Sequence, residues 1–254
     1  MSLFNEVLIF LAAVAAGFIN AMAGGGTLVS FPVLLAVGIS PVVANVTNTV
    51  ALVPGTIGGM WSQRNEFQSQ YRRLLKLLPV AIVGGIMGGL LILNTSESAF
   101  RSIIPYLILV ATLLLAAQVK IKKWVVARIG HAHTEHQNPI IMLSLVFAAA
   151  IYGGYFGAGL GVILMAVLGL VTDESMTRLN FLKQALGFAI NLAAAIYFAF
   201  SGKVDWWVAL VMVFGSLLGG LIGGKLAGKI KPEMLRWIVV CAGLIAATVF
   251  FLKD

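Results

Sequence analysis

The stretch Ala23-Gly24-Gly25-Gly26-Thr27 separates two apolar runs near the start of the chain. The first run covers residues 4–22, and the second, residues 28–39, is too short to cross a membrane comfortably. Each of three consecutive glycines costs a helix on the order of 1 kcal/mol, so we expect the helix to break here. Broken backbone at membrane depth survives only where protein or a water-filled cavity covers it. The break is therefore a candidate site, and the free N–H groups that open the second run would suit an anion.

The composition excludes a soluble domain. Hydrophobic residues make up 60% of the chain and charged residues 10%, and the mean hydropathy is +1.02. At ~20 residues per span, the chain has room for roughly eight to ten short crossings. The net charge of +8 comes from basic residues at the ends of apolar runs, where they set topology rather than bind nucleic acid. The single cysteine, Cys241, excludes a disulfide framework and a cysteine-based metal site.

Apolar runs follow one another along the whole chain. They cover residues 4–22, 28–39, 41–60, 74–93, 99–119, 139–156, 160–171, 175–200, 206–227 and 235–252. The two short runs each follow a glycine cluster directly, which indicates an internal duplication.

Two residue offsets relate the halves of the chain. A shift of 133 residues superposes Gly24 on Gly157, Gly26 on Gly159 and Thr47 on Asn180. A shift of 135 residues superposes the glycines 84, 85, 88 and 89 on the glycines 219, 220, 223 and 224. We therefore predict a first transmembrane repeat at 1–120, a cytoplasmic linker at 121–138 and a second repeat at 139–254.

The basic residues decide the orientation. If each glycine-broken pair returns to the side it left, nearly all lysines and arginines fall on one side. The residues on that side are Arg64, Arg72, Arg73, Lys76, Lys120, Lys122, Lys123, Arg128, Arg178, Lys183, Lys225, Lys229, Lys231 and Arg236, and those on the other are Arg101, Lys203 and Lys253. This favours an all-α polytopic membrane protein of two inverted repeats, each a glycine-broken helical hairpin plus three transmembrane helices. Both termini are then outside and the basic loops cytoplasmic.

The spaced glycines Gly84/Gly88 and Gly219/Gly223 allow two helices to approach closely. They predict tight packing within the chain, with a homodimer seam as the alternative, because small-residue faces serve both purposes.

Several motifs resemble one known family. Gly17-x-x-Asn20 leading into the first glycine cluster and Pro32, followed by Ala44-Asn45-Val46-Thr47-Asn48-Thr49, resembles the first-repeat signature of the sulfite exporter TauE/SafE family. The segment 153–159, Gly-Gly-Tyr-Phe-Gly-Ala-Gly, resembles the second-repeat signature. The resemblance implies a multi-pass permease of a bacterial-type plasma membrane for sulfur-containing anions such as sulfite, sulfonates or sulfoacetate.

An anion inside the bilayer needs hydrogen bonds to replace those of water. The candidate donors are backbone N–H groups at the two breaks and polar side chains beside them. They are Asn20, Gly24, Gly25, Gly26, Thr27, Asn45, Thr47, Asn48, Gly157, Gly159, Gly161, Asn180, Lys183 and Gln184. For the polar side chains, helix–helix hydrogen bonding or capping is the alternative interpretation.

Lys183 is the strongest single candidate for a binding residue, because a cation within a membrane span indicates a functional site. The alternative is snorkelling from about two turns inside its helix. No Asp or Glu falls in the middle of a run, so a carboxylate proton relay is not supported.

Other function classes have weaker support. His131, His133, Glu135 and His136 could hold Zn²⁺, but they lie in the polar linker, where we expect a plain loop. No G-x-S-x-G or H-E-x-x-H motif or buried acid pair indicates an enzyme, and we expect no cofactor or resident metal. The sequence thus predicts an alternating-access permease whose partners are a small anion and the lipid bilayer; the alternative is an anion channel, or a carrier for another small organic anion.

Overall fold

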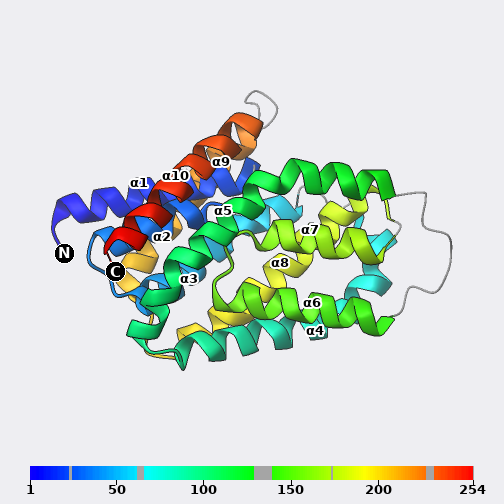
Figure 1. Ribbon diagram of the computed structural model, residues 1–254, viewed down its shortest axis with the longest axis horizontal. Helices are drawn as coiled ribbons and strands as arrows, with labels where there is room; N and C mark the ends of the chain where they lie inside the picture. The colour runs from blue at the N-terminus through cyan, green and yellow to red at the C-terminus, as the bar shows by residue number, and fades with distance from the viewer. Residues whose placement is uncertain (23–24, 62–65, 129–138, 173, 227–231, 254) are drawn as a thin grey trace.

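The computed structural model describes residues 1–22, 25–61, 66–128, 139–172, 174–226 and 232–253, and these residues form helices and short connections without a strand (Figure 1). The helices are α1 (Leu3–Met22), α2 (Thr27–Ala36), α3 (Pro41–Trp61), α4 (Phe67–Leu93), α5 (Glu97–Arg128), α6 (Pro139–Tyr155), α7 (Leu160–Val171), α8 (Met176–Ala199), α9 (Trp206–Leu226) and α10 (Pro232–Lys253).

Within the described residues, six helices are long and apolar enough to cross a membrane: α1, α4, α5, α8, α9 and α10. The chain is therefore a multi-pass membrane protein, as its composition predicts. Helices α2 and α7 have only 10 and 12 residues, because a glycine break precedes each of them. Helix α3 is 21 residues long but carries Asn45, Thr47 and Asn48, all buried inside the protein.

Two helices extend beyond the apolar runs that predict them. Helix α4 begins at Phe67 rather than residue 74, and α5 continues to Arg128 rather than ending at 119. Both extensions are rich in lysine and arginine. Because these charges lower the local hydropathy, a hydropathy pattern places the end of the span before them. The helical backbone continues because these residues are good helix formers.

Close packing of helices distant in sequence relies on glycine. Helix α1 packs along α9, and α4 packs along α6. A Cβ at Gly219 would overlap the carbonyl oxygen of Val14, and one at Gly88 would overlap that of Ile151. These glycine faces are thus covered by helices of the same chain. This agrees with tight packing within the chain, the first interpretation of the glycine spacing.

The other helix pairs complete the bundle. Helix α3 packs against α8 and α9, and α4 also packs against α8. Helix α5 lies against α10 and α7, while α10 also contacts α2. One buried cluster includes Phe31, whose ring meets those of Phe100 and Phe156 edge-on at 6.4 and 5.4 Å. The α2 half-helix is therefore held in the interior rather than at the surface.

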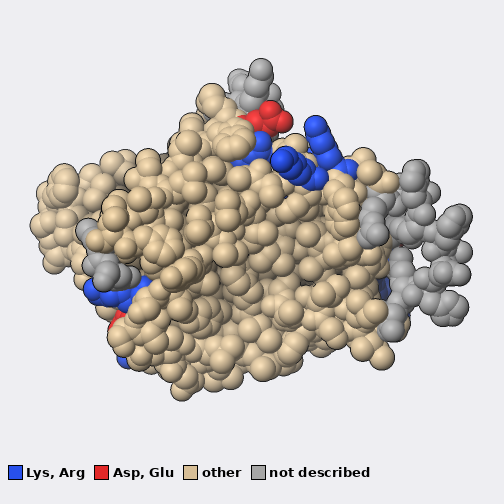
Figure 2. Space-filling view, in the orientation of Figure 1, with Lys and Arg blue, Asp and Glu red and all other residues tan. Residues whose placement is uncertain are grey.

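Both ends of the chain lie at one end of the molecule, whereas the end of α5 and the start of α6 lie at the other (Figure 1). In the view of Figure 2 the centre of the surface is free of charged side chains, and the blue and red atoms gather toward the edges. An uncharged centre on this face, with the charges at its margins, is what a bilayer-facing surface requires.

Candidate functional site

The first break is closed by a side chain from the helix before it. Gly25 has φ +92°, in the left-handed region that favours glycine, and α2 begins at Thr27. The Asn20 side-chain oxygen accepts a hydrogen bond of 2.7 Å from the Gly26 N–H. The sequence predicts a free donor for an anion here; for the Gly26 N–H that prediction is wrong, because Asn20 caps it. Gly24 lies outside the described residues.

The second break leaves only part of its amide hydrogens free, because the Gly157 N–H donates to the Tyr152 carbonyl and the Leu160 N–H to the Gly157 carbonyl, each at 3.2 Å. Helix α6 ends at Tyr155, and Gly159 precedes α7 with φ +76°. The Tyr152 hydroxyl donates to the Ala158 carbonyl at 2.6 Å, which fixes the turn. The N–H groups of Gly159 and Gly161 donate no hydrogen bond within the described part of the chain. The Gly159 and Gly161 N–H groups are thus two unpaired donors at the positive end of the α7 dipole.

The two breaks meet on one face of α5. A Cβ on Gly25 would lie 3.1 Å from Leu115 Cδ2, and one on Gly159 would lie 3.6 Å from the Cα of Ala111. Ala111 and Leu115 are four residues apart and so share a face one turn from each other. Both breaks therefore lie at nearly the same level along α5, inside the protein.

A polar stripe on α8 faces the second break. The predicted residues Asn180, Lys183 and Gln184 have i, i+3 and i+4 spacing and share one helix face. A Cβ on Gly161 would lie 3.8 Å from Lys183 Cδ, so this face looks toward the first turn of α7. Gly161 itself is exposed and Lys183 half-buried.

The Lys183 ammonium group has no compensating acid. Within the described residues no carboxylate forms an ion pair with it. An uncompensated cation beside free N–H groups creates a positive potential that an anion would relieve.

The three predicted side chains of α3 make structural hydrogen bonds. Asn45 Nδ2 donates to the carbonyl oxygen of Tyr155 at 2.8 Å, and Asn48 Oδ1 accepts from the Ser30 hydroxyl at 2.5 Å. Thr47 Oγ1 accepts from the Asp205 N–H at 3.0 Å. Thr47 and Asn48 are thus engaged in joining α3 to its neighbours. Asn45 keeps a buried side-chain oxygen, Oδ1, without a partner.

Two polar residues near the breaks are absent from the predicted set. Asn191 Oδ1 lies 3.6 Å from the Cβ position of Gly157 and continues the stripe of α8. Arg236 is only 7% exposed, and its Nε has no hydrogen-bond partner. It stands one turn before Val239, whose Cγ1 lies 3.8 Å from the Cβ position of Gly25. Because Arg236 stands at the start of a span, the sequence groups it with the cations that set membrane topology. Its spacing of three and four residues from Val239 and Val240 is the signal that could have placed it on a buried helix face.

Among the described residues no group of His, Cys, Asp and Glu could hold a metal ion. The candidate zinc cluster at His131, His133, Glu135 and His136 lies outside those residues.

Comparison with known proteins gives consistent matches. The family model for "Sulfite exporter TauE/SafE" matches residues 9–250. A "Probable membrane transporter protein" of Haemophilus influenzae is 26% identical over 213 residues, covering 83% of this chain and 80% of the relative. "Probable membrane transporter protein ORF9" of a Sinorhizobium species is 27% identical, with coverages of 83% and 78%. "Probable membrane transporter protein YfcA" of Escherichia coli K12 is 25% identical, with coverages of 83% and 76%. No solved structure matches the chain significantly.

Proposed function

The chain belongs to the sulfite exporter TauE/SafE family of membrane transporters, and from that membership we propose that it carries small sulfur-containing anions by alternating access. The substrate class is sulfite, sulfonate or sulfoacetate. The membrane is a bacterial-type plasma membrane, with both termini outside and the basic loops cytoplasmic. The alternative is an anion channel, or a carrier for another small organic anion.

Helix packing supports two inverted repeats, 1–120 and 139–254, joined by the linker 121–138. Exchanging the halves converts α1 into α6 and α4 into α9, so the α1–α9 pair becomes the α6–α4 pair, and both are present. The same exchange relates α3–α9 to α8–α4 and α2–α10 to α7–α5. A two-fold relation between halves of a transporter is the framework for alternating access.

The observation that carries the proposal is the convergence of both glycine breaks on one turn of α5, at Ala111 and Leu115. Broken half-helices that meet inside a membrane protein place backbone donors where no lipid reaches. The predicted residues Gly25, Thr27, Gly157, Gly159 and Gly161 line this region in the proposal.

Two cations complete the site. Lys183 lies beside Gly161, and Arg236 lies one turn from the residue that covers Gly25. Neither has an ion-pair partner within the described residues. An ionisable residue within a span is costly unless a partner compensates it, and a transported oxyanion is such a partner.

The test is flux of labelled sulfite and sulfoacetate into proteoliposomes containing the purified protein. A carrier gives saturable uptake and counterflow, whereas a channel gives linear, non-saturating flux. Vesicles lacking protein and the variant Lys203→Ala, which removes an exposed lysine between α8 and α9, are the controls. If no sulfur oxyanion is transported and a carboxylate shows saturable flux, the proposed substrate class is wrong and the substrate is an organic carboxylate.

A further inference from the structure

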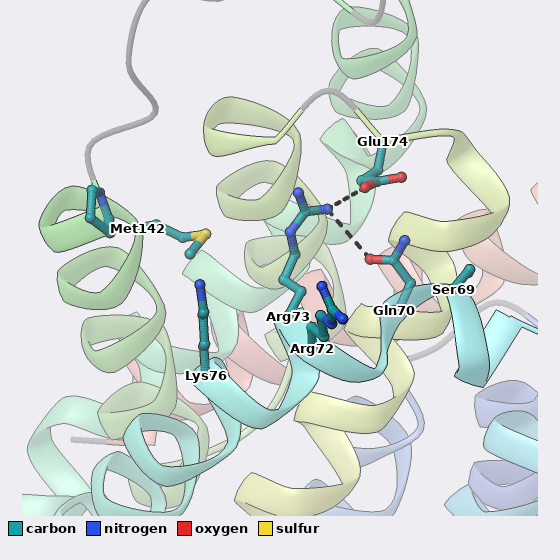
Figure 3. A pocket seen from close by; sticks show the side chains of 8 residues that line it. Ser69, Gln70, Arg72, Arg73, Lys76, Met142 and Glu174 are labelled. Carbon is teal, nitrogen blue, oxygen red and sulfur yellow. Dashed lines mark hydrogen bonds and ion pairs between the residues drawn. The ribbon is translucent and has the colours of Figure 1, made fainter.

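A basic hollow opens at the start of α4, away from the glycine breaks. It has a volume of about 360 Å³ and is bordered by Gln70, Arg72, Arg73 and Lys76 of α4. Met142 of α6 and Glu174, which precedes α8, border its other sides. Figure 3 shows Lys76 directed toward Met142 and Arg73 directed toward Glu174, with the hollow between them.

One of its three cations is fixed in place. Arg73 donates to Glu174 at 2.6 Å and to the Gln70 side-chain oxygen at 3.4 Å (Figure 3). Glu174 is shared with Arg178 at 3.1 Å. Gln70 is almost fully buried, so this wall of the hollow is anchored in the protein interior.

The other two cations have no compensating acid. Arg72 and Lys76 are exposed and form no ion pair with a described carboxylate. The hollow thus carries an excess of positive charge beside a fixed arginine, which is the arrangement that binds phosphate groups.

The surroundings of the hollow are apolar. Leu75, on α4 between the basic residues, is 49% exposed, and Ile141, next to Met142 on α6, is 54% exposed. Tyr71 is exposed on the same helix, as is typical of the membrane–water interface. The hollow therefore lies where lipid-facing side chains give way to charged ones.

We propose that this hollow binds the phosphate of an anionic phospholipid, with Arg72 and Lys76 on the phosphate and the acyl chains along Leu75 and Ile141. Basic pockets between helices at a charged membrane face bind such headgroups, and the adjoining apolar surface distinguishes a lipid from a soluble phosphate. Because α4 and α6 both border the hollow, the lipid joins the first half of the chain to the second.

Titration of the purified full-length protein in detergent with short-chain phosphatidylglycerol tests the proposal, with native mass spectrometry and thermal unfolding as readouts. Phosphatidylcholine of the same chain length and inorganic phosphate are the comparison ligands. We expect phosphatidylglycerol to bind and raise the melting temperature, and phosphatidylcholine and phosphate to do so only at far higher concentrations. The double variant Arg72→Gln/Lys76→Gln weakens binding roughly thirtyfold.

The matched control is Arg101→Gln/Lys203→Gln, which removes two exposed cations elsewhere in the chain and leaves the response unchanged. Thermal unfolding without lipid establishes that both double variants fold. An equal response to phosphatidylcholine, or an undiminished response in Arg72→Gln/Lys76→Gln, would overturn the site. An equal response to inorganic phosphate would overturn the lipid as its occupant. The assay measures no transport, so its result is independent of the proposed carrier function.

Discussion

Asn45 of α3 donates its side-chain N–H to the carbonyl oxygen of Tyr155, the last residue of α6, at 2.8 Å. The bond joins the first half of the chain to the second glycine break, 110 residues away in sequence. Asn45 is 1% exposed, so its end of the bond is shielded from water. The geometry of the break between α6 and α7 therefore depends on a residue of the other half.

Replacing Asn45 with alanine should destabilise the protein by about 1 kcal/mol, because the half-buried Tyr155 carbonyl loses its hydrogen-bond donor. Unfolding in detergent by a chemical denaturant measures the loss. The matched control is Asn94→Ala, since Asn94 also donates to a backbone carbonyl, that of Leu90, but is exposed at a helix end. If both variants lose the same free energy of unfolding, the Asn45 bond contributes no more to stability than an exposed hydrogen bond at a helix end.

Lys183→Ala should raise the apparent KM for the transported anion or abolish transport, and it should leave folding intact. The reason is that the variant removes an uncompensated cation beside the free N–H groups of α7. Uptake in proteoliposomes is the measurement, with Lys183→Arg expected to retain part of the activity. Lys203→Ala is the control for loss of a lysine charge, and unchanged kinetics in Lys183→Ala would exclude Lys183 from the site.

Much of the fold could be predicted from the sequence, because the constraint that the bilayer imposes on helices is local. Runs of apolar residues predict all the helices given above, and the glycine clusters predict the two breaks. The extensions of α4 and α5 beyond the apolar runs could not be predicted from hydropathy, because hydropathy reports where the membrane ends and not where the helix ends.

Burial of single polar residues was less predictable. Arg236 and Arg178 both stand near the start of an apolar run, yet Arg236 is buried and Arg178 is exposed in an ion-pair cluster. Which of two such cations faces the interior depends on how α10 and α8 rotate against their neighbours. That rotation is set by packing between helices far apart in sequence, which hydropathy does not report.

Arg236→Gln should raise the apparent KM more than it lowers the maximal rate, because a buried guanidinium whose Nε has no hydrogen-bond partner acts on binding of the anion. Initial rates over a range of sulfite concentrations separate the two parameters. Lys225→Gln, which alters an exposed cation in the last turn of α9, should change neither. If Arg236→Gln instead lowers the melting temperature and leaves KM unchanged, the arginine serves only packing.

Stability should fall in acid through Glu174. Burial raises the pKa of this carboxyl group, but hydrogen bonds from Arg178 and Arg73 outweigh it and hold the pKa below its ordinary value. A depressed folded-state pKa stabilises the protein fully above the unfolded value of about 4.3, and the stabilisation disappears as the pH falls through the folded value.

The melting temperature of the wild type should therefore decline below about pH 4, and Glu174→Gln should reduce that decline while lowering the melting temperature at pH 7. Thermal unfolding across the pH range is the measurement. Glu233→Gln, at an exposed site, should keep the wild-type acid dependence. An identical acid decline in Glu174→Gln would show that the ion-pair cluster contributes nothing to it.

Two neighbouring glycines of the second break should respond differently to alanine. Gly159 has φ +76°, so Gly159→Ala forces a side chain into the left-handed region and should cost about 1–2 kcal/mol of stability. Gly161 lies in the first turn of α7, where a methyl group meets only Lys183 Cδ at 3.8 Å. Gly161→Ala should thus preserve the melting temperature but impair anion uptake, because the methyl group occupies the space between Lys183 and the free N–H groups. Melting curves and proteoliposome uptake on both variants separate backbone strain from obstruction of the site, and full uptake by a stably folded Gly161→Ala would place the anion elsewhere.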